Sequence, residues 1–267
     1  MKQNSRRERI YGLLLTRKRV RVNELCWECR ASEATIRRDL QEMEQNGLLR
    51  RVHGGAELLK TALLDGDARE LSLREKLLLN LEAKRQIGMA AAELVEDNDR
   101  IFLEAGSTVI QMVPYLWGKR DLVVVTNCLA VADEIAKNSN IRMILVGGEY
   151  RSTSMAMAGL VAESCLQQIF SQIYVDKLFM GADGVTLDEG VTTPSLDESR
   201  LGLVLIKMVK KKILLVDSTK FGRVDLCRFA PAEAFDMIVT DDGVRPDLEK
   251  GLKKKGIKLI VAPKPPE

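Results

Sequence analysis

The sequence predicts a small, basic, helical module followed by a larger α/β domain built on a mostly parallel sheet. The chain has 267 residues, enough for about two domains. Residues 1–60 hold 14 Lys and Arg against 8 Asp and Glu, whereas residues 61–267 hold 27 against 30. Beyond residue 95, short apolar runs alternate with helical patterns. The charge asymmetry indicates that only the first segment meets a polyanion, either nucleic acid or an acidic membrane surface.

Composition favours a globular protein of the cytoplasm. Apolar residues make up 46% of the chain and charged residues 30%, which is ordinary for a folded domain. No apolar run reaches the roughly 18 residues of a membrane helix, and MKQNSRRERI lacks the apolar core of a secretion signal. The five cysteines are odd in number and scattered, unlike a secreted disulfide framework. We therefore expect a cytoplasmic location.

Three short helices are predicted between residues 6 and 48. Their apolar residues recur three or four positions apart, which places them on one face of each helix: Ile10, Leu13 and Leu14; Val22, Leu25, Cys26 and Cys29; Ile36, Leu40 and Met43. Ser32 is expected to cap the third helix through its hydroxyl oxygen. Gly47 stands where a helix end favours a left-handed residue.

The third helix has a polar face opposite its apolar stripe. With Ile36 and Leu40 turned inward, its polar and basic residues must project outward. A short helix of this kind behind a second helix and a tight turn is typical of the recognition element of a helix-turn-helix, which enters the major groove of DNA. The residues expected to contact DNA from it are Ser32, Glu33, Thr35, Arg37 and Arg38.

The stretch LLRRVHGGA predicts a two-stranded wing. It carries Arg50, Arg51 and His53 ahead of a glycine pair that suits a tight turn. Basic side chains in a wing bind the DNA backbone by charge and counterion release. The alternative is a small solvated bundle with ordinary surface arginines. Cys26 and Cys29 have the spacing of a zinc half-site, but no second pair follows, so we expect a core role and no metal.

Residues 1–57 are therefore taken as the winged module, 58–74 as a linker and 75–267 as the α/β domain. A helix is expected from about Leu71 to Val95. Continuous apolar runs separated by helical segments favour a parallel sheet covered on both faces. The runs are Ile101–Leu103, Leu122–Val125, Met143–Val146, Lys177–Met180, Ile213–Val216, Met237–Val239 and Lys258–Val261.

The segments that follow these runs are polar and rich in glycine. Ligands of open α/β sheets bind beyond the carboxyl ends of the strands. Gly106 would allow close approach of a ligand, and the adjacent hydroxyls and a following helix N-terminus would donate to a phosphate. Lys220 could neutralise the anion. Together these segments predict a pocket for a small phosphorylated ligand. Its candidate residues are Glu104, Gly106, Ser107, Thr108, Thr126, Asn127, Gly148, Asp183 and Lys220.

Specific motifs in both halves resemble the DeoR family of bacterial transcriptional regulators. In the first half these are TIRRDL, the following glycine–leucine turn and R-x-H-G-G-A; the segment Cys26–Arg30 before the third helix departs from the family pattern. The second half contains FLEAGST, VVTNCLAVA, VGGEYR, LFMGADGV, GVTTPSLDES and LLVDSTKFG. The resemblance implies a winged helix-turn-helix that binds operator DNA and an effector domain related in fold to ribose-5-phosphate isomerase.

The resemblance also implies roles in sensing a phosphorylated sugar or a related metabolite. Gly106, Ser107 and Thr108 would hold the phosphate, with Lys220 opposite. Asp183 and Glu198 would lie near the sugar hydroxyls. Glu104 stands where the family often has aspartate.

The expected function is a ligand-responsive transcription factor, a repressor rather than an activator, that binds no cofactor. Two DNA-binding heads meeting two half-sites would require a homo-oligomer, a dimer or a tetramer. An isomerase-like enzyme is the alternative, with Glu198 and Asp183 as carboxylates. The stretch VTLDEGVTTP lacks the lysine-plus-glycine loop of the isomerases, and the single histidine, His53, belongs to the wing. A constitutive architectural DNA binder is the third possibility.

Overall fold

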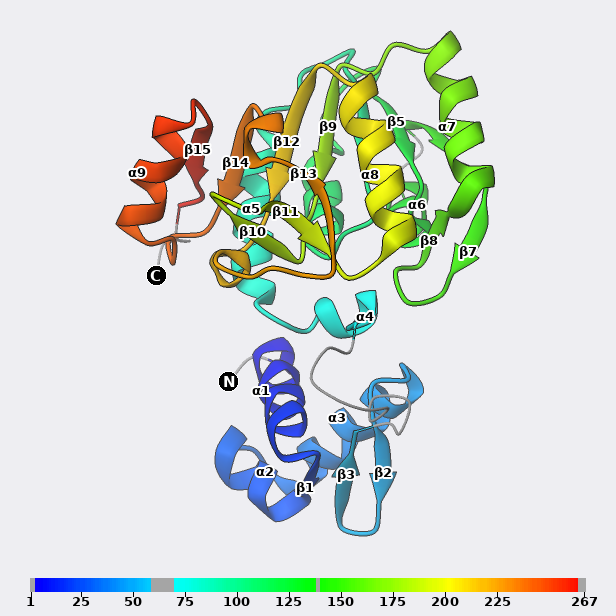
Figure 1. Cartoon of the computed structure of the whole chain (residues 1–267). Helices are drawn as coiled ribbons and strands as arrows, with labels where there is room; N and C mark the ends of the chain where they lie inside the picture. The colour runs from blue at the N-terminus through cyan, green and yellow to red at the C-terminus, as the bar shows by residue number, and fades with distance from the viewer. Residues whose placement is uncertain (1–2, 59–69, 138–139, 264–267) are drawn as a thin grey trace. The chain divides into compact units, whose positions relative to one another are not determined.

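The computed structural model describes residues 3–58, 70–137 and 140–263. The chain divides into two compact units, Met1–Leu81 and Glu82–Glu267 (Figure 1). The expected linker, residues 58–74, falls largely on residues 59–69, which lie outside the described residues. The unit boundary follows Leu81, whereas the sequence placed the start of the second domain at residue 75. No helix within the described ranges is long and apolar enough to cross a membrane.

The three predicted helices of the first unit are present. They are α1 (Gln3–Arg17), α2 (Val22–Cys29) and α3 (Glu33–Gln45). The Ser32 hydroxyl accepts a hydrogen bond from the Thr35 amide at 3.3 Å, so the predicted N-cap is confirmed. Gly47 has φ +69°, the left-handed conformation expected past the helix end.

The wing contains one strand more than predicted. The strands β1 (Arg19–Arg21), β2 (Arg50–Val52) and β3 (Gly55–Glu57) form an antiparallel sheet in the order β1-β3-β2. Buried apolar side chains from all three helices and from the wing form one core. Among them, Ile36, Leu40 and Met43 are the stripe on α3 that the spacing predicted.

A buried carboxylate fastens α1 to α3. Asp39 is 1% exposed and accepts hydrogen bonds from Arg6 and, at 3.1 Å, from Arg7. The bond to Asp39 raises the pKa of the Arg6 guanidinium. The aspartate of the TIRRDL motif therefore serves the interior of this unit rather than its outward face.

The helix expected from Leu71 to Val95 is interrupted. It is divided into α4 (Leu73–Lys76) and α5 (Leu81–Ala92). Asn80 between them has φ +53°, a left-handed conformation that stops an α-helix and that asparagine tolerates better than most residues. The expectation of one continuous helix was wrong, because apolar spacing on both sides masked this break.

All seven predicted apolar runs form strands of one parallel sheet in the second unit. The sheet has the order β15-β14-β12-β9-β4-β5-β6. Its strands are β4 (Arg100–Leu103), β5 (Val123–Thr126), β6 (Arg142–Leu145), β9 (Lys177–Met180), β12 (Lys211–Leu215), β14 (Met237–Thr240) and β15 (Lys258–Val261). The predicted α/β class is confirmed.

The strand order reverses between β4 and β9. The chain proceeds from β4 outward through β5 to β6, and then returns to place β9 on the other side of β4. From β9 it continues through β12 and β14 to β15. The strand order therefore has its switch point at β4 and β9, the place in open α/β sheets beyond which ligands usually bind.

Shorter strands and helices connect or follow the strands of this sheet. The hairpin of β7 (Glu149–Arg151) and β8 (Ala156–Ala158) follows β6. The strands β10 (Gly184–Thr186), β11 (Gly190–Thr193) and β13 (Cys227–Ala230) form a small antiparallel sheet. The remaining helices are α6 (Leu129–Ala136), α7 (Gly159–Gln172), α8 (Leu196–Met208), α9 (Pro246–Lys254) and the 3₁₀ segments η2 (Val109–Tyr115), η3 (Ser218–Lys220) and η4 (Ala232–Ala234).

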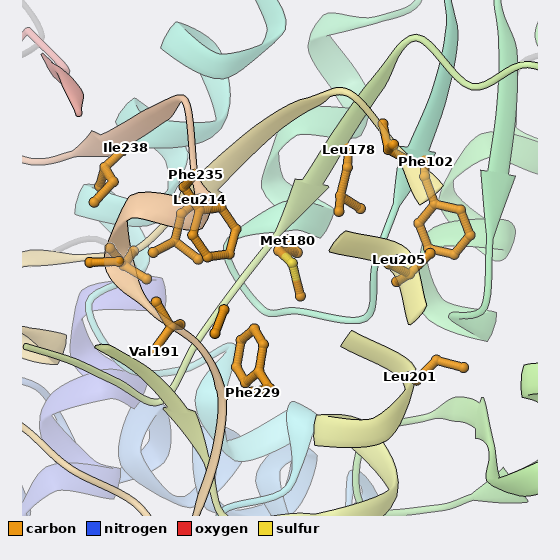
Figure 2. Close-up of a cluster of buried hydrophobic side chains, with 14 of the residues drawn as sticks. Phe102, Leu178, Met180, Val191, Leu201, Leu205, Leu214, Phe229, Phe235 and Ile238 are labelled. Carbon is orange, nitrogen blue, oxygen red and sulfur yellow. The ribbon is translucent and has the colours of Figure 1, made fainter. Parts of the chain in front are cut away.

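A hydrophobic core joins α8 to one face of the sheet. In Figure 1, α8 lies in front of the sheet and α5 behind it. Figure 2 shows Leu201 and Leu205 of α8 in one cluster with Phe102, Leu178 and Met180 of the strands, all at most 3% exposed. Each such side chain contributes about 1.5–3 kcal/mol by burial. This packing fixes α8 and its first turn relative to the carboxyl ends of the strands.

Candidate functional sites

The outward face of α3 carries the predicted DNA-contacting residues. Glu33, Arg37 and Arg38 are exposed on α3, with Ser32 at its N-terminus, and Thr35 is half-buried. The Arg37 Nη2 lies 2.6 Å from Glu33 Oε1, one helical turn away. Arg38 makes no ion pair with any described residue. Of the two adjacent arginines, one is therefore held by a carboxylate and one is free to meet a phosphate or a base.

The predicted wing arginines are both paired with carboxylates. The Arg50 Nε lies 2.8 Å from Glu57 Oε1 on the neighbouring strand. Glu44 of α3 accepts from the Arg51 amide at 2.8 Å and from its Nε at 2.7 Å. These bonds from the Arg51 backbone and side chain lower the pKa of Glu44. His53 is exposed at the turn of the wing.

The Cys-x-x-Cys pair of α2 packs with the hydrophobic core of the first unit. Cys26 is half-buried, Cys29 is buried, and both thiols are free. Burial raises the pKa of Cys29. No group of three or more His, Cys, Asp or Glu residues that could hold a metal ion occurs in the described ranges.

In the second unit, buried polar side chains gather at the carboxyl edge of the sheet. After β4, Glu104, Ser107 and Thr108 are at most 9% exposed. The hydroxyls of Ser107 and Thr108 make no hydrogen bond to the described residues and remain available as donors. A Cβ on Gly106 would lie 3.2 Å from the Val109 side chain and 3.8 Å from the backbone of Gly181, so the two strand-end segments approach each other closely.

The helix expected directly after Thr108 is a seven-residue 3₁₀ helix, η2, that contains Pro114. Proline has no amide hydrogen, so this segment cannot continue a regular helical ladder. A short 3₁₀ helix offers no α-helical N-terminus to an anion. The donors that this segment could offer to an anion are therefore the hydroxyls of Ser107 and Thr108 and the loop backbone.

After β5, the predicted residues already serve the fold. The Thr126 hydroxyl donates to Leu103 O at 2.6 Å and accepts from the Cys128 amide at 3.1 Å. The Asn127 Nδ2 donates to Met157 O at 3.2 Å, while its Oδ1 is buried and has no hydrogen-bond partner in the described ranges. Burial raises the pKa of the Cys128 thiol to about 11. Asn127 Oδ1 is the atom at this position with unused capacity for a ligand.

Gly148, after β6, has a packing reason of its own. A Cβ at this position would lie 2.7 Å from Ala162 Cβ of α7 and 3.2 Å from Ala158 O. The glycine therefore allows α7 to approach the edge of the sheet. Its contact with a ligand stays a prediction.

Two internal ion pairs hold the charged residues of the site. The Lys220 Nζ lies 3.3 Å from Asp183 Oδ1, and both side chains are 17% exposed. Glu198, in the first turn of α8, accepts from Arg151 Nη1 at 2.9 Å and from the Thr193 hydroxyl at 3.1 Å. Ser195 caps α8 by accepting from the Glu198 amide.

These pairs are linked through the small antiparallel sheet. The Asp183 amide donates to Thr192 O at 3.1 Å, and the next residue, Thr193, contacts Glu198. Sequence reasoning missed Arg151 and Thr193. Arg151 ends the VGGEYR motif and is separated from Glu198 by 47 positions, so only the hairpin of β7 and β8 reveals the pair.

Comparison with known proteins identifies both units. Residues 6–62 match the DeoR-like helix-turn-helix domain, and residues 79–242 match the DeoR C terminal sensor domain. The chain belongs to the DeoR family. The resemblance inferred from TIRRDL and the strand-end motifs is thereby confirmed, together with the expected class of helix-turn-helix transcriptional regulator.

Relatives in this family align over nearly the whole chain. The HTH-type transcriptional regulator GolR of Listeria innocua is 32% identical over 257 residues, covering 96% of this chain and 98% of that protein. The lactose phosphotransferase system repressor of Staphylococcus epidermidis is 33% identical over 252 residues, covering 94% and 95%.

A solved structure shows a distant likeness. Ribose 5-phosphate isomerase A from Methanocaldococcus jannaschii is 16% identical and covers 53% of this chain and 55% of its own, with a TM-score of 0.38.

Proposed function

We propose that this DeoR-family protein is a repressor of sugar-metabolism genes, and that a phosphorylated sugar bound to its sensor unit controls its hold on operator DNA. The observation that carries the sensor half of the proposal is the set of buried polar side chains at the carboxyl edge of the sheet, where the strand order reverses. Ligands of open α/β sheets usually bind at such switch points of the strand order. The names of the relatives, which include a lactose phosphotransferase system repressor, support the choice of target genes.

The unpaired hydroxyls of Ser107 and Thr108 support a phosphate position at the loop after β4. Lys220, which follows β12, supplies the positive charge. Asp183 and Glu198 accept hydrogen bonds from sugar hydroxyls. In the structure these charges are paired as Lys220–Asp183 and Arg151–Glu198. A phosphate would compete with Asp183 for Lys220, so ligand binding would reorganise these pairs.

Reorganisation of these pairs would change the protein through α8. Glu198 lies in the first turn of α8, and the core in Figure 2 fixes this helix to the sheet. A ligand that draws Glu198 away from Arg151 would alter the contact between α8 and the β7–β8 hairpin. The ligand shifts DNA binding only if it binds two arrangements of the protein with different affinity. A homo-oligomer would present two heads to two half-sites.

The geometry does not favour catalytic turnover. The two carboxylates suited to proton transfer, Asp183 and Glu198, each bond to a cation. The single histidine of the sequence, His53, lies in the wing of the first unit. An isomerase assay on sugar phosphates, with Glu198→Gln as control, tests the enzyme alternative. Turnover abolished by that change would overturn the proposal.

The central experiment titrates sugar phosphates and their parent sugars against a complex with duplex DNA selected from a random pool. We expect a sugar phosphate to release the wild-type protein from DNA, while the parent sugar does so weakly. Lys220→Ala should keep DNA affinity and blunt the response. Lys253→Ala is the matched control, because it removes a lysine that is paired with Glu249 on α9.

Three results would count against the proposal. Failure of the wild-type protein to select any DNA would contradict the proposed operator binding. Release by no member of a broad panel would favour a constitutive DNA binder. Release of the Lys220→Ala variant from DNA at the same ligand concentration as the wild type would show that Lys220 does not bind the effector.

A further inference from the structure

Most arginines of the first unit that flank the recognition helix are already neutralised. Arg37 is paired with Glu33, Arg50 with Glu57 and Arg51 with Glu44. Two arginines of β1, Arg19 and Arg21, are exposed and make no ion pair within the described part of the unit. The unneutralised charge of the wing therefore lies on the strand that the sequence did not predict.

Strand geometry directs both of these arginines to one side. Successive side chains of a strand alternate between its faces, so Arg19 and Arg21 share a face while Val20 takes the other. Val20 is 1% exposed in the core, which turns the arginine face outward. The pattern Arg-Val-Arg thus builds a pair of cations on one edge of the wing.

The turn of the wing lies directly beside β1. β1 pairs with β3, with Arg21 opposite Gly55. A Cβ on Gly55 would lie 2.1 Å from Val20 O, so only glycine permits this approach. The Val22 amide donates to Gly54 O at 2.9 Å and ties the start of α2 to the same turn.

A hollow of about 440 Å³ results, and it is basic on balance. Its lining comes from β1, the first turn of α2 and the turn of the wing: Arg19, Val20, Arg21, Glu24, His53, Gly54 and Gly55. Two acids lie close. Glu24 accepts from the Arg21 amide at 3.0 Å, and Glu57 stands opposite Arg19 but bonds to Arg50.

We propose that Arg19 and Arg21, with His53 beside them, form a clamp for a phosphate of the DNA backbone, separate from the contacts of α3. The inference rests on the proposed DNA-binding function. Arginine binds phosphate through a planar fork of donors, and unpaired cations gain most from counterion release. The clamp positions the protein on the duplex and carries no sequence information itself.

The test measures affinity for a labelled duplex against salt concentration, with the full chain, on both the selected operator and an unrelated duplex. We expect Arg19→Ala and Arg21→Ala each to weaken binding roughly tenfold on both duplexes and to reduce the salt slope by about one. Arg19→Lys and Arg21→Lys should keep the slope. Arg9→Ala is the matched control: it removes an equal charge from an arginine that is paired with Glu28.

Glu24→Gln adds an opposite test, because the amide oxygen keeps the bond to the Arg21 amide while the repelling charge is lost. Binding should then tighten severalfold on both duplexes, since the carboxylate no longer opposes the phosphate. Slopes for Arg19→Ala and Arg21→Ala equal to that of Arg9→Ala would overturn the clamp. So would a loss confined to the operator. Loss of wild-type binding to every duplex would instead defeat the proposed function.

Discussion

In the first unit, the charged side chains proposed to meet a partner are exposed to solvent. At the sheet edge of the second unit, the charged candidate residues are half-buried and paired with one another. Arg38 and the two arginines of β1 are exposed and unpaired among the described residues. Lys220, Asp183, Arg151 and Glu198 are at most 26% exposed and form two ion pairs. The two proposed sites would therefore bind their partners by different physical means.

This difference implies different free-energy costs for the binding of DNA and for the binding of an effector. DNA meets cations that need no rearrangement, so its affinity should follow counterion release and depend steeply on salt. On the proposed function, a sugar phosphate would first compete with internal carboxylates, so part of its binding free energy would be used to displace them. Displacing these carboxylates would couple ligand binding to a change of conformation. A ligand that binds two conformations equally well does not shift the equilibrium between them.

The largest effect is expected at Asp39, because this carboxylate is buried, whereas the arginine–glutamate pairs on the outward face of the first unit are exposed. Asp39→Ala leaves Arg6 and Arg7, whose side chains are 13% and 16% exposed, without this carboxylate. Breaking such a pair should cost the first unit about 3 kcal/mol, because a charge remains poorly solvated.

Hydrogen exchange of α1 and α3 in the full chain measures this loss, while the second unit serves as internal reference. Glu33→Ala is the control, since its pair with Arg37 is exposed and should contribute little. Equal protection of α1 and α3 in the Asp39 variant and the wild type would show that the buried pair does not hold the unit together.

The next effect separates free from paired arginines on the DNA-binding surface. Arg38→Ala should weaken operator binding by about 1–3 kcal/mol if this arginine reads a base. Arg50→Ala should weaken it less, because Glu57 already competes for that guanidinium. Fluorescence anisotropy with operator and unrelated duplexes distinguishes them. A larger loss for Arg50→Ala would mean that DNA displaces Glu57 and that pairing in the free protein is a poor guide.

The elements that repeat a pattern over many residues could be predicted from sequence. Seven apolar runs predicted seven parallel strands, and apolar spacing predicted α2 and α3 with the cap at Ser32. Strands of three residues, such as β1 and β7, were missed because such short segments carry no periodicity. The 3₁₀ helix after Thr108 was misjudged because apolar spacing outweighed the signal of Pro114.

The charged side chains of the sites could be named, but not their partners. Lys220 and Asp183 were named from strand-end segments and Glu198 from the family resemblance, while Arg151 was not singled out. Ion pairs between residues far apart in sequence depend on tertiary contacts that no local pattern encodes. The 37 positions between Asp183 and Lys220 are brought together only by the strand order of the sheet.

A smaller effect compares the helix caps of the two regions. Ser32 caps α3 and Ser195 caps α8, each accepting an amide hydrogen bond at 3.3 Å. Replacement by alanine should cost about 1 kcal/mol in each unit. Ser195→Ala should also change the response to sugar phosphate, because the cap fixes the Glu198 amide, whereas Ser32→Ala should change only DNA binding. Thermal unfolding and ligand titration of both variants test this. An unaltered ligand response in Ser195→Ala would show that the cap of α8 does not contribute to the sensor site.

The smallest effect concerns the acid side of the pH profile of the wing. Hydrogen bonds from the Arg51 amide and guanidinium lower the pKa of Glu44, so the ionised carboxylate favours the folded wing. This stabilisation is complete above the glutamate pKa of the unfolded chain, about 4.3, and is lost as the pH falls through the lower folded value. The Arg51 amide resonance should therefore titrate with a midpoint below about 4.3, and Glu44→Gln should abolish that transition. A midpoint above the ordinary glutamate value would mean that Arg51 does not hold Glu44 in solution, and would place Arg51 among the cations free to meet DNA.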